Sequence, residues 1–201
     1  MSDTRIINIS KITANDCYEI SKSFEEQQWQ KPIEQYIQYM DNQNNGLIDV
    51  LLAKDNNKFA GYCIIQWKSE YTFFYKNDIP EIKDLNVLKK YQRKGIATAL
   101  MEEAERRIFY KSNLCGLQVG LTNDYGKAHQ LYIKRGYVPD GNGLIYKNIN
   151  VKYNERVVVD GNIVTSRSAG TAIDFALEII SQLLGSKKSK EIKDEIVYSK
   201  K

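Results

Sequence analysis

Hydrophobic positions recur along the chain with strand-like alternation in some segments and helical spacing in others, which predicts alternating strands and helices. Strand-like apolar runs lie at residues 5–9, 48–53, 59–67, 82–88, 114–121, 137–147 and 155–159, and the aromatic run at 71–75 is expected to extend a strand. Helical spacing is expected at residues 15–28, 32–40, 96–108 and 126–135. The pattern predicts an α/β protein whose first half is antiparallel.

Turn and cap residues give these elements their expected limits. Asn15 or Asp16 is expected to cap the first helix, and Pro32 suits the first turn of the second. Residues 41–46 are a loop by composition, and residues 54–58 form a polar hairpin turn between two strands.

The junction of residues 81–100 carries the strongest chemical signal. A strand feeds a basic, glycine-bearing turn that opens an amphipathic helix, so free backbone N–H groups and the helix dipole converge there. Gly95 lets the backbone approach a bulky anion, and Ala97 keeps the first turn thin. The basic side chains that give this junction a positive electrostatic potential are Lys89, Lys90, Arg93 and Lys94. The junction is predicted to be a phosphate cradle.

Two segments carry a family resemblance. The first is the Q-x-x-G-x-A stretch from Gln92 to Ala97. The second contains Asn123, Ala128, Leu131-Tyr132 and Gly136-Tyr137. Together they resemble motifs A and B of the GNAT superfamily of acetyl-CoA-dependent N-acetyltransferases, over roughly residues 4–159. The resemblance implies a mixed, mainly antiparallel twisted sheet flanked by helices.

The resemblance also implies a cofactor position. Coenzyme A would lie between two splayed strands, at residues 82–88 and 114–121, with the acetyl and pantetheine portions held by backbone groups of residues 86–88. The N–H of Val87 or Leu88 is the candidate oxyanion donor. The expected cofactor contacts are Asn86, Val87, Leu88, Gln92, Arg93, Lys94, Gly95, Ile96, Ala97, Thr98, Asn123 and Ala128.

Acetyl transfer to an amine needs an acid and a base. Tyr132 is the candidate general acid, because a phenol can protonate a leaving thiolate without being ionised itself; packing is the alternative. Glu81, which starts the strand, is the first candidate base and Asp84 the second. Their odd spacing predicts opposite faces, so only one would face the acceptor. A base acting through water would suffice, and a merely solvated carboxylate stays open. The single histidine, His129, is expected on the surface.

The acceptor side is expected at residues 24–39. It is rich in aromatic and acidic side chains: Trp29, Tyr36, Tyr39, Glu25, Glu26 and Glu34. These suit a cationic amine by cation–π and charge attraction, although a core role for the aromatics is equally open. A polyamine, an aminoglycoside-like amine, an amino acid and a protein N-terminus all remain candidates.

The last forty residues follow another pattern. Residues 157–195, with Asp160-Gly-Asn and Thr165-Ser-Arg, look like the C-terminal strand and helix of the PfpI/parkinsonism-associated deglycase family, with Ser168 replacing a glycine. Nothing in the chain corresponds to that family's cysteine nucleophile, so its thiol chemistry is not expected. We therefore expect an acetyltransferase domain at residues 1–159 and an extension at 160–201.

An apolar stripe marks this extension. Residues 171–184 are predicted to form a helix with a wide hydrophobic face, which must pack on its own domain or pair two chains as a homodimer. Gly185 is expected to end the helix, and residues 186–190 to be a solvated basic run.

Composition narrows the function classes. The net charge of +4 is mild and the lysines are spread along the chain, which argues against nucleic acid binding. Cys17, Cys63 and Cys115 are scattered without metal-site spacing, so reduced thiols and no metal are expected. Neither a signal pattern nor an apolar run of ~20 residues appears, which predicts a cytoplasmic protein without membrane contact.

Three functions follow from these patterns. The first is an N-acetyltransferase that moves the acetyl group of acetyl-CoA to a primary amine of a small molecule or peptide. The second is a sensor that binds acyl-CoA without catalysis. The third is a fusion protein whose tail assembles chains.

Overall fold

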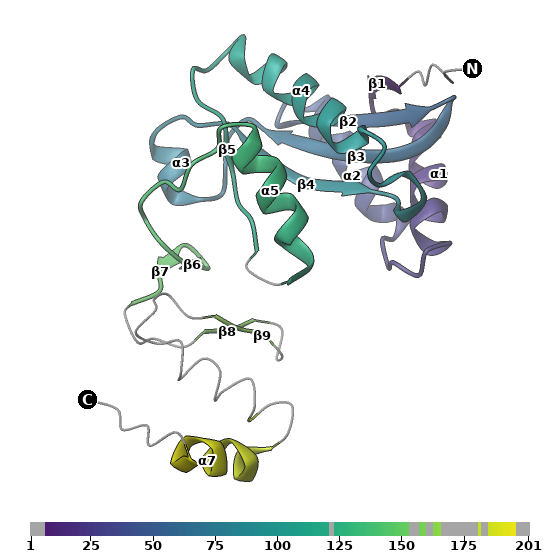
Figure 1. Ribbon diagram of the computed structural model, residues 1–201. Helices are drawn as coiled ribbons and strands as arrows, with labels where there is room; N and C mark the ends of the chain where they lie inside the picture. The colour runs from purple at the N-terminus through teal and green to yellow at the C-terminus, as the bar shows by residue number, and fades with distance from the viewer. Residues whose placement is uncertain are drawn as a thin grey trace. The chain divides into compact units, whose positions relative to one another are not determined.

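Two units make up the chain in the computed structural model, Met1–Gln118 and Val119–Lys201, and each is described by itself (Figure 1). The structure describes residues 7–120, 123–152, 157–159, 163–165, 181 and 185–195. The first unit contains β1 (Ile7–Lys11), α1 (Ala14–Glu25), α2 (Ile33–Asn44), β2 (Ile48–Asp55), β3 (Lys58–Gln66), α3 (Thr72–Lys76), β4 (Glu81–Val87), a 3-10 turn (Lys89–Tyr91), α4 (Ile96–Phe109) and β5 (Gly116–Leu117). The expected domain boundary at residues 159/160 stays a prediction.

The first unit is built on one five-stranded sheet with the order β1-β2-β3-β4-β5. The first four strands pair antiparallel, and β5 adds to β4 in parallel. The predicted hairpin is confirmed, because β2 and β3 are joined by Asn56 and Asn57, both with positive φ (49° and 64°). Two left-handed residues are what a two-residue type I′ turn requires. The mixed, mainly antiparallel fold class is confirmed.

Helices cover both faces of this sheet (Figure 1). On one face α1 and α2 enclose a core that includes Ile20, Phe24, Tyr36 and Tyr62. On the other lies α4, whose sheet-facing apolar positions are buried, as its helical spacing predicted, whereas Phe109 at its end is exposed. The buried positions are Ile96, Leu100, Met101, Ala104 and Ile108. The sheet is therefore a buried central layer, and only its edges and strand ends are open to ligands.

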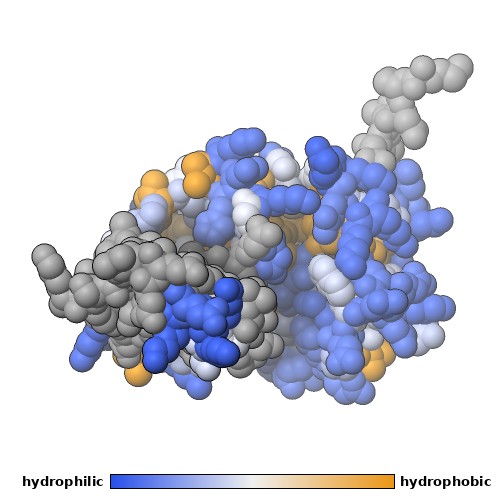
Figure 2. All heavy atoms as spheres, turned by 60° about the horizontal axis from the view of Figure 1, so that its bottom comes forward, coloured by the Kyte–Doolittle hydropathy of each residue, from blue (hydrophilic) through white to orange (hydrophobic). Residues whose placement is uncertain are grey.

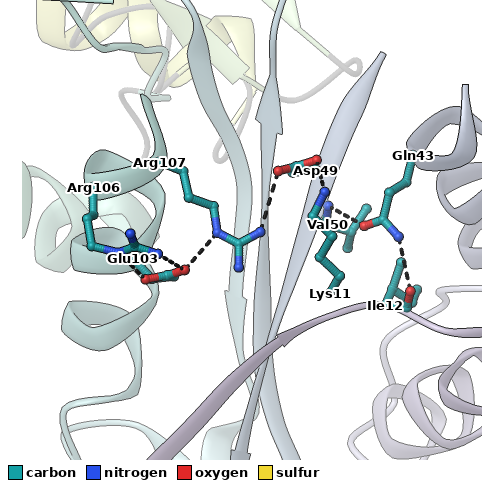
Figure 3. Close-up of polar contacts among 8 residues, drawn as sticks. All are labelled: Lys11, Ile12, Gln43, Asp49, Val50, Glu103, Arg106 and Arg107. Carbon is teal, nitrogen blue, oxygen red and sulfur yellow. Dashed lines mark hydrogen bonds and ion pairs between the residues drawn. The ribbon is translucent and has the colours of Figure 1, made fainter. Parts of the chain in front are cut away.

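Helix α2 continues through residues that composition assigned to a loop. The side chain of Gln43 in its last turn accepts a hydrogen bond from the N–H of Val50 and donates one to the carbonyl of Ile12, both 3.1 Å long (Figure 3). Gly46 (φ +71°) and Leu47 then close the helix through N–H bonds to Gln43 and Asn42. The expected loop at residues 41–46 is wrong because Gln43 satisfies strand backbone groups from a helical position.

A chain of ion pairs ties α4 to β1 and β2 (Figure 3). Asp49 on β2 lies 2.6 Å from the ammonium of Lys11 and 3.4 Å from the guanidinium of Arg107. Arg107 also donates to Glu103 at 2.7 Å, as does Arg106 at 2.8 Å. These hydrogen bonds, Arg106 first, lower the pKa of Glu103 to about 2. The network fixes the helix that begins at Gly95.

Two local expectations are corrected by packing. Thr13, not Asn15 or Asp16, is the N-cap of α1, and Asp16 completes a capping box by accepting bonds from the N–H and hydroxyl of Thr13. The aromatic run at 71–75 is the short helix α3 rather than a strand. Tyr71 and Phe74 are three residues apart and both buried, so a helical turn places them on one face.

The second unit contains short elements only. They are a 3-10 turn (Asn123–Tyr125), α5 (Gly126–Lys134), β6 (Ile145–Tyr146), β7 (Ile149–Asn150), β8 (Val157–Val159), β9 (Ile163–Thr165) and α7 (Ser186–Glu195). β6 pairs with β7 and β8 with β9 in two separate hairpins. The expectation that residues 137–147 and 155–159 complete the main sheet is therefore wrong for their described parts.

The C-terminal expectations have mixed outcomes. Residue 181 is helical and Gly185 (φ +88°) follows it, donating to the carbonyl of Ser181, as expected for a helix end. The apolar helix itself, at residues 171–184, otherwise lies outside the described residues. The basic run at 186–190 is largely exposed, as expected, and forms the first part of α7. Gly185, with its left-handed backbone, therefore lies between the helical residue 181 and α7.

On the face shown in Figure 2, the described residues are mainly hydrophilic, and the exposed hydrophobic residues lie in small groups. Within the part of the chain that the structure describes, no helix has the length and hydropathy needed to cross a membrane. Cys63 is a buried free thiol, as its apolar run predicts, whereas Cys115, for which a similar run predicts burial, is only half-buried and precedes β5; Cys17 is buried as well. The expected strand at 114–121 is thus reduced to two residues.

Candidate functional site

Strands β4 and β5 separate after two residue pairs. Only Glu81 and Ile82 pair with β5, opposite Gly116 and Leu117, although β4 continues to Val87. Residues 83–87 therefore present a backbone edge that β5 does not cover. Pairing therefore ends where the motifs imply that the two strands splay apart.

A bulge lies in the open half of β4. Tyr62 is opposite Asn86 and Ile64 is opposite Lys83, so two β4 residues face one β3 residue. Asp84, inside the bulge, has a left-handed φ of +50°. Gly61 makes the close approach possible, because a Cβ there would lie 2.5 Å from the carbonyl oxygen of Asn86. The bulge breaks side-chain alternation, so the argument from odd spacing between Glu81 and Asp84 does not hold.

The structure distinguishes the two candidate oxyanion donors, the N–H groups of Val87 and Leu88. The N–H of Leu88 donates to the carbonyl of Ala60 at 2.9 Å, so it is already engaged. Leu88 itself is buried, and the N–H of Lys89 is accepted by the side chain of Gln27 at 2.9 Å. Neighbouring N–H groups of a strand point to opposite edges, which leaves Val87 as the candidate on the open edge.

The predicted phosphate loop has the geometry of an anion site. Gly95 is the N-cap of α4 with φ +82°, and Arg93 is also left-handed with φ +60°. The first intrahelical bond from a backbone N–H at this end runs from Ala99 to Gly95, so the N–H groups of Ile96, Ala97 and Thr98 precede the ladder.

The side chains around this loop suit a pyrophosphate. Gln92, Arg93 and Lys94 are exposed, and the amide of Gln92 donates to the carbonyl of Val87 at 3.4 Å. That contact ties the loop to the open half of β4. Free N–H groups, the helix dipole and two cationic side chains fit the diphosphate of coenzyme A.

Glu81, the first candidate base, lies in a closed position. It is 2 % exposed and accepts hydrogen bonds from the hydroxyl of Ser69 at 2.5 Å and the amide of Gln118 at 2.9 Å. Both of its oxygens are engaged within the paired half of β4. These contacts join three segments of the first unit, so the carboxylate of Glu81 has a structural role.

Asp84, the second candidate, stands at the centre of a polar cluster. Its carboxylate accepts bonds from the hydroxyls of Tyr62 (2.5 Å) and Tyr39 (3.0 Å), the ammonium of Lys31 (3.2 Å) and the amide of Asn86 (2.6 Å). These donors come from β3, α2, the α1–α2 connection and β4. The cluster places a carboxylate beside the open half of the strand.

Electrostatics keep this carboxylate ionised. Burial alone would raise the pKa of Asp84, but the bond from Tyr62 and the charge of Lys31 outweigh it, so the pKa lies below its ordinary value. Burial and then the Asp84 charge raise the pKa of Tyr39 to about 12. The cluster is therefore an anion surrounded by neutral phenols and one cation.

The expected acceptor side chains divide into two groups. Tyr36 is buried in the core, while Tyr39 and Trp29 are partly buried against it. Glu25, Glu26 and Glu34 are exposed. The sequence interpretation missed the side chains that connect these helices to Asp84. Tyr62 could have been found from strand alternation, since Ile64 shares its face, whereas nothing marked Lys31.

The motif B residues belong to the second unit. The N–H groups of Gly136 (φ +87°) and Tyr137 donate to the carbonyls of Ile133 and Tyr132, which is a Schellman cap for α5. The cap brings the rings of Tyr132 and Tyr137 to 6.0 Å, so the L-Y and G-Y pairs have a local structural reason.

The other motif B candidates lie near the start of α5. Asn123 opens the 3-10 turn before the helix, and Ala128 is half-buried on the helix itself. His129, expected on the surface, is half-buried, and its Nε2 lies 2.9 Å from the carbonyl of Gly120. Among the described residues, no group of three or more His, Cys, Asp or Glu side chains could hold a metal ion.

Comparison with known proteins gives a family match over most of the first unit and the start of the second. The Acetyltransferase (GNAT) family model matches residues 14–137. A predicted acetyltransferase from Clostridium acetobutylicum, solved with acetyl-CoA, superposes with a TM-score of 0.53 at 16 % identity, over 70 % of this chain and 96 % of that one. Glucosamine-6-phosphate N-acetyltransferase from Arabidopsis thaliana gives 0.52 at 12 %, over 68 % and 94 %. At these identities the structures support the fold.

A second match covers the C-terminal part. The DJ-1/PfpI family model matches residues 123–182. Protein DJ-1alpha of Drosophila melanogaster is 49 % identical over 45 residues, which are 22 % of this chain and 21 % of that protein. The chain thus spans about a fifth of that relative's length.

Proposed function

Because the chain belongs to the GNAT acetyltransferase family, whose members use acetyl-CoA as co-substrate, we propose that it acetylates a primary amine of a small molecule or peptide. Transfer is direct, within a ternary complex of enzyme, acetyl-CoA and amine. The observation that carries the proposal is the open half of β4, which joins an anion-binding loop at Gly95 to an ionised carboxylate at Asp84. These are the two features that thioester binding and amine activation need.

Each residue of the open half has a proposed task. The N–H groups at the start of α4 and the side chains of Arg93 and Lys94 bind the pyrophosphate. The N–H of Val87 stabilises the oxyanion of the tetrahedral intermediate, as a donor of this kind contributes about a hundredfold or more in rate. Asn123 and Ala128 remain proposed cofactor contacts in motif B.

Proton transfer is assigned to two side chains. We propose Asp84, rather than the closed Glu81, as the group that receives the ammonium proton of the acceptor, directly or through water. Its carboxylate is ionised and borders the α1–α2 connection. Tyr132 is the proposed acid that protonates the departing thiolate, since its hydroxyl is neutral at physiological pH.

The test is a panel of primary amines incubated with the protein and acetyl-CoA, read by release of free thiol. Polyamines, aminoglycosides, amino sugars, amino acids and peptides with free N-termini cover the acceptor classes. We expect amine-dependent thiol release for at least one class. Acetyl-CoA binding by calorimetry without thiol release across the panel would contradict catalysis and favour the sensor function.

We also propose that two chains pair through the apolar segment at residues 171–184. The support is the width of its hydrophobic stripe, which is costly to leave in water at about 25 cal/mol per Å². Light scattering should give a dimer for the wild type and a monomer or aggregate for Ile180→Glu. A wild type that is monomeric at high concentration would contradict pairing.

A further inference from the structure

The side chain of Lys31 fills a cage built for an ammonium group. Its Nζ lies 2.8 Å from the hydroxyl of Tyr62 and 3.2 Å from the carboxylate of Asp84. It also lies 5.4 Å from the ring centre of Phe24 and 5.2 Å from that of Tyr62. A carboxylate, the hydroxyl edge of a phenol and the nearby ring of Phe24 are groups that recognise an organic ammonium.

Lys31 is the exchangeable member of this cluster. The other three donors to Asp84 come from β3, α2 and β4, whereas Lys31 lies on the connection between α1 and α2. Its contact with the carboxylate, at 3.2 Å, is the longest of the four. Its side chain keeps 18 % of its surface exposed, and that of Asp84 keeps 24 %.

The ammonium group of Lys31 can leave the cage without a movement of the backbone that connects α1 and α2. The carbonyl of Lys31 is held by the hydroxyl of Ser21 on α1 at 2.9 Å, and Pro32 begins the next helix as its N-cap. The backbone is thus fixed at both sides, and rotation about the four-carbon stem alone can withdraw the charge. The neighbouring Phe24 stacks on Trp29 at 5.7 Å, so one wall of the cage stays in place without the lysine.

We propose that this cage is the subsite for the acceptor's ammonium group, and that Lys31 is an internal occupant which the acceptor must displace. The ligand class is a primary ammonium on an unbranched alkyl chain, since a lysine side chain fits the cage. The cage is an ammonium site whether or not the chain catalyses; its role as acceptor subsite rests on the proposed function. Lys31 then lowers the apparent affinity for the acceptor by the fraction of time that it holds the cage.

The first test measures binding without acetyl-CoA. Lys31→Ala should bind n-propylammonium at least about tenfold more tightly than the wild type, by calorimetry or NMR titration. The neutral isostere n-propanol should not gain affinity, and Asp84→Asn in the Lys31→Ala background should remove the gain. Lys22→Ala, which removes an exposed lysine of α1, is the matched control and should bind like the wild type.

An equal gain for n-propanol would show a shape-filling void, and equal binding by wild type and variant would show that Lys31 does not compete. Either result overturns the ammonium cage. If Lys31→Ala does not fold, Lys31→Met removes the charge while keeping the stem, and the same comparison applies.

The second test uses whichever amine supports thiol release. Lys31→Ala should lower the KM for that amine about tenfold while kcat changes little, and Lys22→Ala should leave both unchanged. A KM that is unchanged or higher overturns the acceptor assignment. Absence of turnover in the wild type would instead contradict the proposed function, and the binding test would still decide the cage.

Discussion

The two halves of strand β4 differ in their strand pairing and in the surroundings of their carboxylates. At its start, Glu81 and Ile82 are paired on both sides, and the carboxylate of Glu81 is buried and bonded by Ser69 and Gln118. Farther along, residues 83–87 are paired on one side only and contain a bulge. The carboxylate of Asp84 there keeps partial contact with solvent and accepts four hydrogen bonds, one from α2, one from the α1–α2 connection and two from strands β3 and β4.

This contrast shows that position along a strand decides what a carboxylate can do. A carboxylate enclosed by neutral donors on a fully paired strand contributes to packing, because no ligand can reach it. One at a bulge beside an uncovered edge can meet a ligand while its charge stays stabilised.

Replacing Gly95 by Asp should have the largest effect. It places a negative charge where the pyrophosphate is expected and a side chain on a residue with φ +82°. We expect coenzyme A affinity to fall by about a hundredfold or more in calorimetry, through the loss of an anion site at a helix N-terminus. Gly46→Asp, at φ +71° with open surroundings, is the matched control for backbone strain. Equal affinity in a folded Gly95→Asp protein would contradict the phosphate-loop assignment.

Asp84→Asn should remove the base of the open half. The amide keeps the shape of the carboxylate but cannot take a proton, so kcat should fall by about a hundredfold. The acidic limb of the pH–rate profile should flatten, while acetyl-CoA affinity stays close to that of the wild type. Steady-state kinetics across pH with the best amine is the measurement. An unchanged pH–rate profile would mean that water or Glu81, rather than Asp84, acts as the base.

Regular, local features were predictable from the sequence. The β2–β3 hairpin follows from two alternating runs around Asn56-Asn57, and the buried face of α4 follows from its helical spacing. The position of Gly95 follows from a strand that feeds a helix. In each case neighbouring residues carry the whole signal.

The features that were missed depend on distant contacts. A bulge at Asp84 leaves no mark in composition, because one extra residue in a strand changes no average property. The partners of Asp84 lie up to 53 residues away, at Lys31, and were not readable from spacing. Likewise, the last turn of α2 exists because Gln43 reaches backbone groups of Val50 on β2 and of Ile12 just after β1, which overrides its loop-like composition.

Tyr132→Phe tests the acid that the second unit contributes. Loss of the hydroxyl should lower kcat at least about tenfold, with little change in acetyl-CoA affinity, because ring packing on Tyr137 is kept. Tyr18→Phe, at an exposed position of α1, is the matched control and should keep full activity. If kcat of Tyr132→Phe equals that of the wild type, Tyr132 is a packing residue in the Schellman cap.

Glu81→Gln should affect stability rather than rate. Its carboxylate accepts two bonds from neutral donors, and an amide would turn an NH2 group toward one of them. We expect a loss of about 1–3 kcal/mol in the free energy of unfolding, measured in urea, with kcat within about threefold of the wild type. Glu34→Gln, at an exposed position, should change neither quantity. A large drop in kcat with unchanged stability would reverse the roles of the two carboxylates.

The smallest effect is expected in the acid stability of the open half. The pKa of Asp84 is lower in the folded protein than its ordinary value of about 3.9, so its ionisation stabilises the fold above that pH. This contribution disappears as the pH falls through the folded pKa. The free energies of unfolding of wild type and Asp84→Asn should therefore differ most near pH 6 and converge below about pH 4. Both proteins still lose stability in acid, because the pKa of Asp16 is also lowered and its bonds to Lys54 and Thr13 remain. Urea unfolding between about pH 3 and pH 7 measures the two curves. Parallel curves would mean that the charge on Asp84 does not stabilise the fold, and that the polar cluster is held by its phenols and amide alone.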